Sequence, residues 1–158
     1  MNKHFIAKFG SPKMQDKLVN DPNYDVRADV AEHGNDEHRD KLVDDPDEYV
    51  RRVVAEHGNN SHRDKLINDP DVYIRIAVAR NGNDSHRLAL AKMRNTSPAT
   101  LNTIAHYGNT EARDAILDHH NVELGSALST IINHVDATPE QKLIAKHIRD
   151  NVGNKYKY

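Results

Sequence analysis

The chain has 158 residues, which suits one domain and is too short for two of full size. Its 22 basic and 24 acidic side chains nearly cancel, which argues against a general nucleic-acid binder and against a strongly charged disordered chain. Hydrophobic residues reach only 37%, and the absence of cysteine excludes disulfides, thiolate catalysis and cysteine-held metal clusters. No apolar stretch would span a membrane, and the first ten residues lack a signal-peptide core, so we expect a cytoplasmic protein without membrane contact.

Three consecutive segments repeat one 24-residue pattern without gaps. Residues 16–39 read DKLVNDPNYDVRADVAEHGNDEHR, and residues 40–63 read DKLVDDPDEYVRRVVAEHGNNSHR. Residues 64–87 read DKLINDPDVYIRIAVARNGNDSHR. The first two segments share 16 of 24 positions and the last two share 15 of 24, so this is an internal repeat and not a compositional bias.

Weaker copies flank the three central repeats. IAKFGSPKMQ (6–15) matches the second half of a repeat, and TIAHYGNTEAR (103–113) keeps its alanine, glycine, asparagine and arginine. The segment ATPEQKLIAKHIRDNV begins with a helix-start signal and continues with apolar residues at helical spacing. We therefore expect one helical-repeat domain over 1–158. Its predicted parts are a half-repeat 1–15, repeats 16–39, 40–63, 64–87, 88–113 and 114–136, a capping helix 137–152 and a tail 153–158.

Each repeat carries the signals of two short helices. In the second repeat, Asp45, Pro46 and Glu48 supply an acidic N-cap, a proline at the first helical position and a carboxylate three residues after the cap. They predict a helix over about 46–57, which Gly58 would end in the left-handed conformation. A second helix, partly 3₁₀, is predicted around SHRDKLIN. The structural caps predicted in this way are Asp21, Asp45, Asp69, Gly34, Gly58 and Gly82.

The fold follows from how little apolar surface one repeat owns. No segment alternates with the two-residue period of a strand. One helix pair has about five apolar residues, too few for it to be stable alone, whereas stacked pairs bury a continuous stripe. The sequence therefore predicts an all-α fold, an α-solenoid of about five two-helix repeats of 24 residues with a C-terminal capping helix.

A unit of the form DPxxxVRxxVAxxGNxxxRxxL resembles the leucine-rich repeat variant, a short relative of HEAT-type helical repeats. The resemblance covers residues 6 to about 128 and is best in the three central copies. It implies a right-handed superhelix of alternating α-helices and short 3₁₀ helices. The chain has Gly-Asn where family members usually have Asn-Pro, and it lacks the cysteine cluster that some members use for an iron–sulfur centre. The resemblance transfers no catalytic residue.

Equivalent positions of stacked repeats form columns, and two of these columns are arginines. For the column Arg27, Arg51 and Arg75 we favour a bond to an aspartate or a carbonyl of the neighbouring repeat. The alternative is a row of guanidinium forks for phosphates or carboxylates. The second column, Arg39, Arg63, Arg87 and Arg113, lies in the short helix, where we expect the side chains to be either solvated or paired with an aspartate. The alternative phosphate-binding ladder comprises Arg27, Arg51, Arg75, Arg39, Arg63 and Arg87.

Histidine is over-used, with 11 residues in the chain. Equivalent histidines of neighbouring repeats should lie about 8–10 Å apart, too far to share an ion that needs ligands at about 2 Å. We expect His38, His62 and His86 to cap helix ends or to bond the Gly-Asn turn. A zinc site completed by a partner and a pH-dependent surface are the alternatives. No cofactor and no resident metal is predicted.

No catalytic motif accompanies the repeats: the sequence has no phosphate-cradling glycine loop, nucleophile elbow or HExxH. We therefore expect a non-catalytic binding module that docks a protein partner on a curved helical surface, as an adaptor, inhibitor or assembly factor. The acidic repeats 16–63 suggest a partner of basic character, and binding of the nucleic-acid backbone is the alternative. The candidate contacts are Tyr24, Asp25, Asp29, Glu48, Tyr49, Arg52, Val72, Tyr73 and Ile76.

Overall fold

The computed structural model describes residues 2–119 and 124–154, the last three of them without side chains. Helices are the only regular elements in these residues, which confirms the predicted all-α fold. None of the described helices joins the length and the apolar composition that crossing a bilayer requires. The chain forms two compact units, residues 1–81 and 82–158. Part of the predicted repeat 114–136 and most of the predicted tail 153–158 lie outside the described residues.

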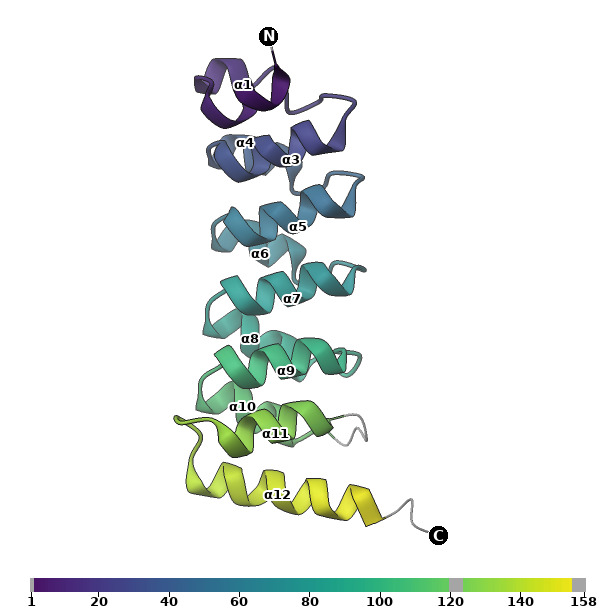
Figure 1. Ribbon diagram of the computed structural model, residues 1–158. Coiled ribbons are helices and arrows are strands. Elements are labelled where there is room, and N and C mark those ends of the chain that lie inside the picture. The colour runs from purple at the N-terminus through teal and green to yellow at the C-terminus, as the bar shows by residue number, and fades with distance from the viewer. Residues whose placement is uncertain (1, 120–123, 155–158) are drawn as a thin grey trace. The chain divides into compact units, whose positions relative to one another are not determined.

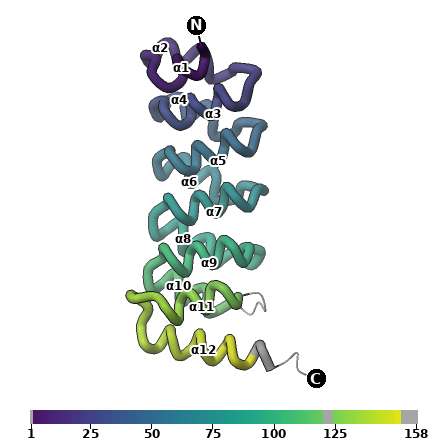
Figure 2. Tube along the Cα trace, in the orientation of Figure 1, coloured from purple at the N-terminus to yellow at the C-terminus, as the bar shows by residue number. Residues whose placement is uncertain are grey.

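The first unit is a stack of helix pairs (Figure 1, Figure 2). Helix α1 and the ten-residue helices α3, α5 and α7 contact one another in succession. The seven-residue helices α4 and α6 each contact the ten-residue helix before and after them. This is the arrangement that a helical repeat requires, because every pair buries its apolar side against a neighbour. The bounds are α1 Lys3–Phe9, α2 Pro12–Gln15, α3 Tyr24–His33, α4 Asp36–Leu42, α5 Glu48–His57, α6 Asn60–Leu66 and α7 Val72–Asn81.

The second unit continues the alternation within its own bounds. Helix α11 contacts both α9 and α12, and α10 contacts both α8 and α12. The predicted closing helix is confirmed, because Thr138 and Gln141 form a reciprocal pair of bonds at its start and Pro139 is its first residue. The right-handed superhelix stays a prediction. The bounds are α8 Asp84–Lys92, α9 Pro98–Tyr107, α10 Thr110–Leu117, α11 Gly125–Asn133 and α12 Pro139–Asn154.

Columns of apolar residues form the core of the first unit. Val26, Val50 and Ile74 are equivalent and at most 2% exposed. A second column four residues further along each helix is fully buried and holds Val30, Val54 and Val78. Residues four apart lie on one side of a helix, so both columns face the neighbouring helices and carry the stack.

The long helices start later than predicted. Helix α5 begins at Glu48, and its N-cap is Asp47, whose carboxylate accepts the N–H of Tyr49 at 2.9 Å. Asp45 is buried and accepts the N–H of Asp47 at 3.0 Å, so it forms a turn before the helix instead of capping it. The predictions that Asp45 is the N-cap and that Pro46 is the first helical residue are wrong.

The same correction applies to Asp21 and Asp69. Asp21 accepts the N–H of Asn23 at 3.0 Å, and Asn23 is the N-cap of α3. Asp69 accepts the N–H of Asp71 at 2.9 Å, and Asp71 accepts that of Tyr73 at 2.7 Å. In each repeat the residue after the proline therefore caps the helix. The aspartate before the proline closes the turn, and its carboxylate can also accept bonds from other repeats.

The glycine after each long helix is needed for space and not for an unusual backbone. Gly34 and Gly58 are the C-cap residues of α3 and α5, but both are extended, and no described residue has a positive φ. The left-handed conformation predicted for Gly34, Gly58 and Gly82 is therefore wrong. A Cβ on Gly58 would lie 2.5 Å from the carbonyl oxygen of Val54 and 2.9 Å from Nδ1 of His62.

The short helices are α-helical and not partly 3₁₀. Helix α6 spans Asn60–Leu66, and Asn59 caps it by accepting the N–H of His62 at 3.2 Å. Asn35 and Asn83 cap α4 and α8 in the same way. Complete capping satisfies the donors of the first turn, which lets a helix of seven residues keep α-helical bonding.

Candidate functional site

The first arginine column joins neighbouring repeats. Arg27 donates from Nε and Nη2 to the two carboxylate oxygens of Asp45 at 2.7 and 2.8 Å. Arg51 makes the same fork on Asp69 at 2.8 and 3.2 Å. The two arginine side chains are only 12% and 16% exposed, and their carboxylate partners raise the pKa of both guanidinium groups. The favoured prediction of a bond to the neighbouring repeat is confirmed for this pair.

Arg75 departs from this pattern. It donates from Nη1 to the carbonyl oxygens of Asp69 and Pro70. The residue eighteen positions further on, which is Asp45 or Asp69 for the two earlier arginines, is Met93. The carboxylate fork is therefore a feature of the first two arginines of the column.

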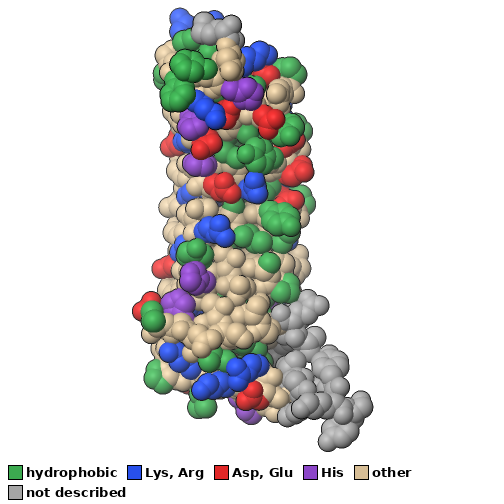
Figure 3. All heavy atoms as spheres, viewed as in Figure 1, with side chains coloured by type: hydrophobic (Ala, Val, Ile, Leu, Met, Phe, Trp, Pro, Cys, Tyr) green, Lys and Arg blue, Asp and Glu red, His purple; other side chains and the backbone are tan. Residues whose placement is uncertain are grey.

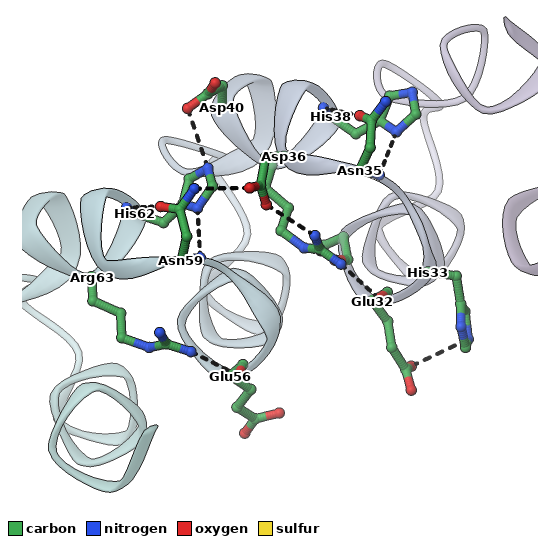
Figure 4. Close-up of polar contacts among 12 residues, drawn as sticks. Glu32, His33, Asn35, Asp36, His38, Asp40, Glu56, Asn59, His62 and Arg63 are labelled. Atoms are coloured by element: carbon green, nitrogen blue, oxygen red, sulfur yellow. Dashed lines mark hydrogen bonds and ion pairs between the residues drawn. The ribbon is translucent and has the colours of Figure 1, made fainter. Parts of the chain in front are cut away.

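The second arginine column closes the ends of the long helices. Arg39 donates to the carbonyl oxygens of Ala31 and Glu32 at 2.8 and 3.0 Å. Arg63 donates to the equivalent carbonyl oxygens of Ala55 and Glu56 at 2.9 and 3.1 Å (Figure 4). Burial lowers the pKa of Arg63. These guanidinium groups satisfy carbonyls that lack helical partners, and Arg87 contacts Asp84 in its own helix at 3.2 Å.

The histidine column is also internal. His38, His62 and His86 are 1–2% exposed. Nδ1 of each ring accepts the N–H of the capping asparagine three residues earlier, at 3.0 Å. Figure 4 shows this bond for His38 and His62. This bond assigns the ring hydrogen of a neutral imidazole to Nε2, which in His62 lies 3.2 Å from Oδ1 of Asp40 in the preceding repeat. The prediction that these histidines cap helix ends and bond the Gly-Asn turn is confirmed.

Aspartates at the edges of these columns are held in their charged form. Lys3, at 2.6 Å, and the N–H of Asn23 lower the pKa of Asp21. A hydrogen bond from the Asn59 amide lowers the pKa of Asp36, and this bond joins two successive repeats. The charged columns of the first unit thus stabilise its own stack.

The positions that vary between repeats lie elsewhere. The three positions at which all three central repeats differ lie in the long helix, and with three further variable positions they form a set spaced i, i+1, i+4, i+5, i+8 and i+9, which is the spacing of one helix face. In α3 these positions are residues 24, 25, 28, 29, 32 and 33, in α5 residues 48, 49, 52, 53, 56 and 57, and in α7 residues 72, 73, 76, 77, 80 and 81. We call this surface the variable face. Outside the variable face, most positions hold the same residue in all three central repeats.

Two grooves open on the variable face, one on each side of α5. The acidic groove, about 290 Å³, is lined by His4, Lys8, Asp25, Ala28, Asp29, Glu32, Tyr49 and Val53. The apolar groove, about 460 Å³, is lined by Arg52, Glu56, His57, Tyr73, Ile76, Ala77, Arg80 and Asn81. Figure 3 shows hydrophobic side chains interspersed with charged ones over this side of α3, α5 and α7. Both grooves fall within the first unit.

Six of the nine predicted contact residues line these grooves: Asp25, Asp29, Tyr49, Arg52, Tyr73 and Ile76. Tyr24, Glu48 and Val72 stand at the starts of the same helices and line neither groove. Tyr24 and Tyr49 meet edge to face at 6.2 Å between ring centroids, and the Arg52 guanidinium lies 5.1 Å from the Tyr49 ring. Tyr73 is the most exposed of these aromatic side chains, at 65%.

The sequence analysis missed two aromatic residues of α1. Phe5 and Phe9 are 59% and 73% exposed and lie with their ring centroids 5.1 Å apart. Counting back 24 residues from Asp29 and His33 leads to these two positions, so the repeat period itself places them in columns of the variable face. The signal was present in the half-repeat.

Metal-binding chemistry has one candidate in the described part of the chain. Asp29, Glu32 and His33 offer ligand atoms within 4.8 Å of one another. The oxygens of Asp29 are already engaged, by Nδ1 of His4 at 2.5 Å and by Nζ of Lys8 at 3.4 Å. We therefore treat this exposed cluster as part of the acidic groove. Comparisons with protein-family models, characterised proteins and solved structures found no match for the chain.

Proposed function

We propose that the chain is a non-catalytic docking module that binds a protein partner on the variable face of its first unit. The observation that supports this most is that constant and variable positions of the repeat lie on different sides of the helices. The histidine and valine columns are buried and nearly unchanged between repeats, whereas two of the three positions at which all three repeats differ, 28/52/76 and 29/53/77, line the two grooves. A surface that differs from repeat to repeat on a constant scaffold suits the recognition of one particular partner.

The charge of the first unit supports a partner of basic character. Residues 16–39 contain seven acidic and three basic side chains, and residues 40–63 contain six and four. Electrostatic complementarity speeds association and selects against other acidic proteins. Action as an adaptor, inhibitor or assembly factor in the cytoplasm and membership of the leucine-rich repeat variants belong to the same proposal.

Nucleic-acid binding receives less support. Four of the six arginines in the alternative ladder donate hydrogen bonds to carboxylates or carbonyls of this chain: Arg27, Arg51, Arg39 and Arg63. Arg27 and Arg51 also lie beside the negative charges of Asp45 and Asp69, which would repel a phosphate at these two positions.

The test compares capture by three forms of the full chain from nuclease-treated lysate of the source cells: wild type, Tyr73→Ala and Leu143→Ala. Tyr73 and Leu143 are 65% and 69% exposed, but Leu143 lies on α12 in the second unit. We expect a protein captured by wild type and Leu143→Ala whose affinity falls about 30-fold in Tyr73→Ala, the effect of losing one interface anchor of about 2 kcal/mol. Capture that resists Tyr73→Ala, or that nuclease abolishes, contradicts the proposal.

A further inference from the structure

The two grooves on either side of α5 differ in charge. The acidic groove has three carboxylates, Asp25, Asp29 and Glu32, against one lysine. Lys8 and His4 both contact Asp29, so among the described residues neither Asp25 nor Glu32 has a lysine or arginine partner. A cation entering this groove would meet two carboxylates without a lysine or arginine partner in the described chain, one of which, Glu32, has His33 Nε2 at 3.7 Å.

The apolar groove has the opposite balance. Arg52 and Arg80 outnumber Glu56, and Tyr73, Ile76 and Ala77 provide the apolar surface between them. Tyr73 presents an aromatic ring with a polar tip, which is the kind of side chain that anchors interfaces at low entropic cost. A large apolar side chain can contact Tyr73, Ile76 and Ala77 here, whereas a lysine or arginine would add a positive charge to a groove in which two arginines, one of them paired with Glu56 at 3.9 Å, already outnumber the single carboxylate.

We propose that one continuous segment of the partner crosses α5 and places a lysine or arginine in the acidic groove and a large apolar side chain in the apolar groove. This inference rests on the proposed docking function. The carboxylates of the acidic groove lie on α3 and the apolar residues of the other groove lie on α7, with α5 between them. Neighbouring helices lie about 8–10 Å apart, so two side chains that reach these residues must be separated by about 16–20 Å. That separation is about six residues in a polyproline-type segment, at 3.1 Å each, or about eleven in a helix, at 1.5 Å each. Both spacings keep the two side chains on one face of the segment.

The experiment selects 16-residue peptides from a random display library on the immobilised full chain and measures their affinities by fluorescence anisotropy. We expect the enriched sequences to pair a basic and a large apolar residue six or eleven positions apart. Glu32→Lys should weaken these peptides about tenfold or more, while Glu37→Lys should change them less than about twofold. Glu32 and Glu37 are both exposed and undergo the same change of charge, but Glu37 lies on α4, off the variable face.

A double-mutant cycle assigns the two ends of the peptide. Replacing the peptide's basic residue by alanine should remove its sensitivity to Glu32→Lys and leave its sensitivity to Tyr73→Ala. Absence of that coupling, another spacing, or no enrichment at all overturns the inference. Peptides that respond to Tyr73→Ala without a paired basic residue overturn the inference alone and leave the docking function standing. Peptides that respond to neither variant contradict both.

Discussion

The fork between Arg51 and Asp69 gives the sharpest test of the stacking account. Arg51→Met keeps the length and the apolar stem of the side chain but removes the guanidinium. It leaves the Asp69 carboxylate, whose side chain is 5% exposed, with only the N–H of Asp71 as a described partner. Breaking a buried pair by removing one member costs about 3–5 kcal/mol. Because Arg51 itself is 16% exposed and water reaches the fork, we expect about 2–3 kcal/mol.

The measurement is urea unfolding of the full chain followed by circular dichroism at 222 nm, with Arg52→Met as the matched control. Arg52 is the next residue of α5, its side chain is 40% exposed, and it contacts the Tyr49 ring and Glu56. That substitution should cost less than about 1 kcal/mol. Adding Asp69→Asn to Arg51→Met should recover about 1 kcal/mol, since the neutral amide keeps the acceptor for Asp71 without a buried charge. Equal losses in Arg51→Met and Arg52→Met would refute the reasoning.

Three further predictions concern stability. Gly58→Ala should lower the free energy of unfolding in urea by about 2 kcal/mol, because its Cβ would collide with the backbone and the His62 ring. Gly125→Ala is the control: a Cβ there has nothing within 4 Å and should be neutral or stabilising by up to about 1 kcal/mol. A larger loss at Gly125 than at Gly58 would contradict the crowding at Gly58. His62→Ala should lower the free energy of unfolding by about 2–3 kcal/mol, because it removes the capping box and leaves a cavity. His57→Ala, at an exposed position, should lower it by less than about 0.5 kcal/mol. Similar losses in the two variants would contradict a stabilising role of the buried ring. Lys3 and the N–H of Asn23 lower the pKa of Asp21, so the contribution of this carboxylate to stability is present above the ordinary carboxyl pKa of about 3.9 and is lost as the pH falls through the lowered value. Asp21→Asn should therefore lose less stability than wild type between pH 5 and 2. Parallel curves of unfolding free energy against pH would contradict this.

The repeat period carried most of what could be predicted from the sequence. It defined the helix pairs and the apolar columns, because identical 24-residue segments must make equivalent contacts when they stack. It also contained the arginine fork, since Arg27 and Arg51 each precede their aspartate by eighteen residues. Local helix signals could not reveal that fork. Asp-Pro reads as a helix start whether the aspartate caps its own helix or receives an arginine from the preceding repeat.

The glycine and the grooves show what local patterns leave out. A glycine after a helix is usually explained by left-handed backbone, but Gly58 is extended and makes room for a ring four residues later. The grooves depend on how neighbouring long helices pack side by side. The sequence therefore predicts Tyr24, Glu48 and Val72 as contacts together with six residues that do line the grooves, although these three do not. Helix periodicity gives the face, and only the packed structure shows where along that face the surface is hollowed.

The most direct test of the central claim is the binding footprint on the full chain labelled with nitrogen-15, measured by amide chemical-shift changes on titration with the captured partner or a selected peptide. The account predicts that the largest changes fall on α3, α5 and α7 at the positions of the variable face, with α4 and α6 little affected. A footprint centred on α4 and α6, or one confined to residues 82–158, would contradict it.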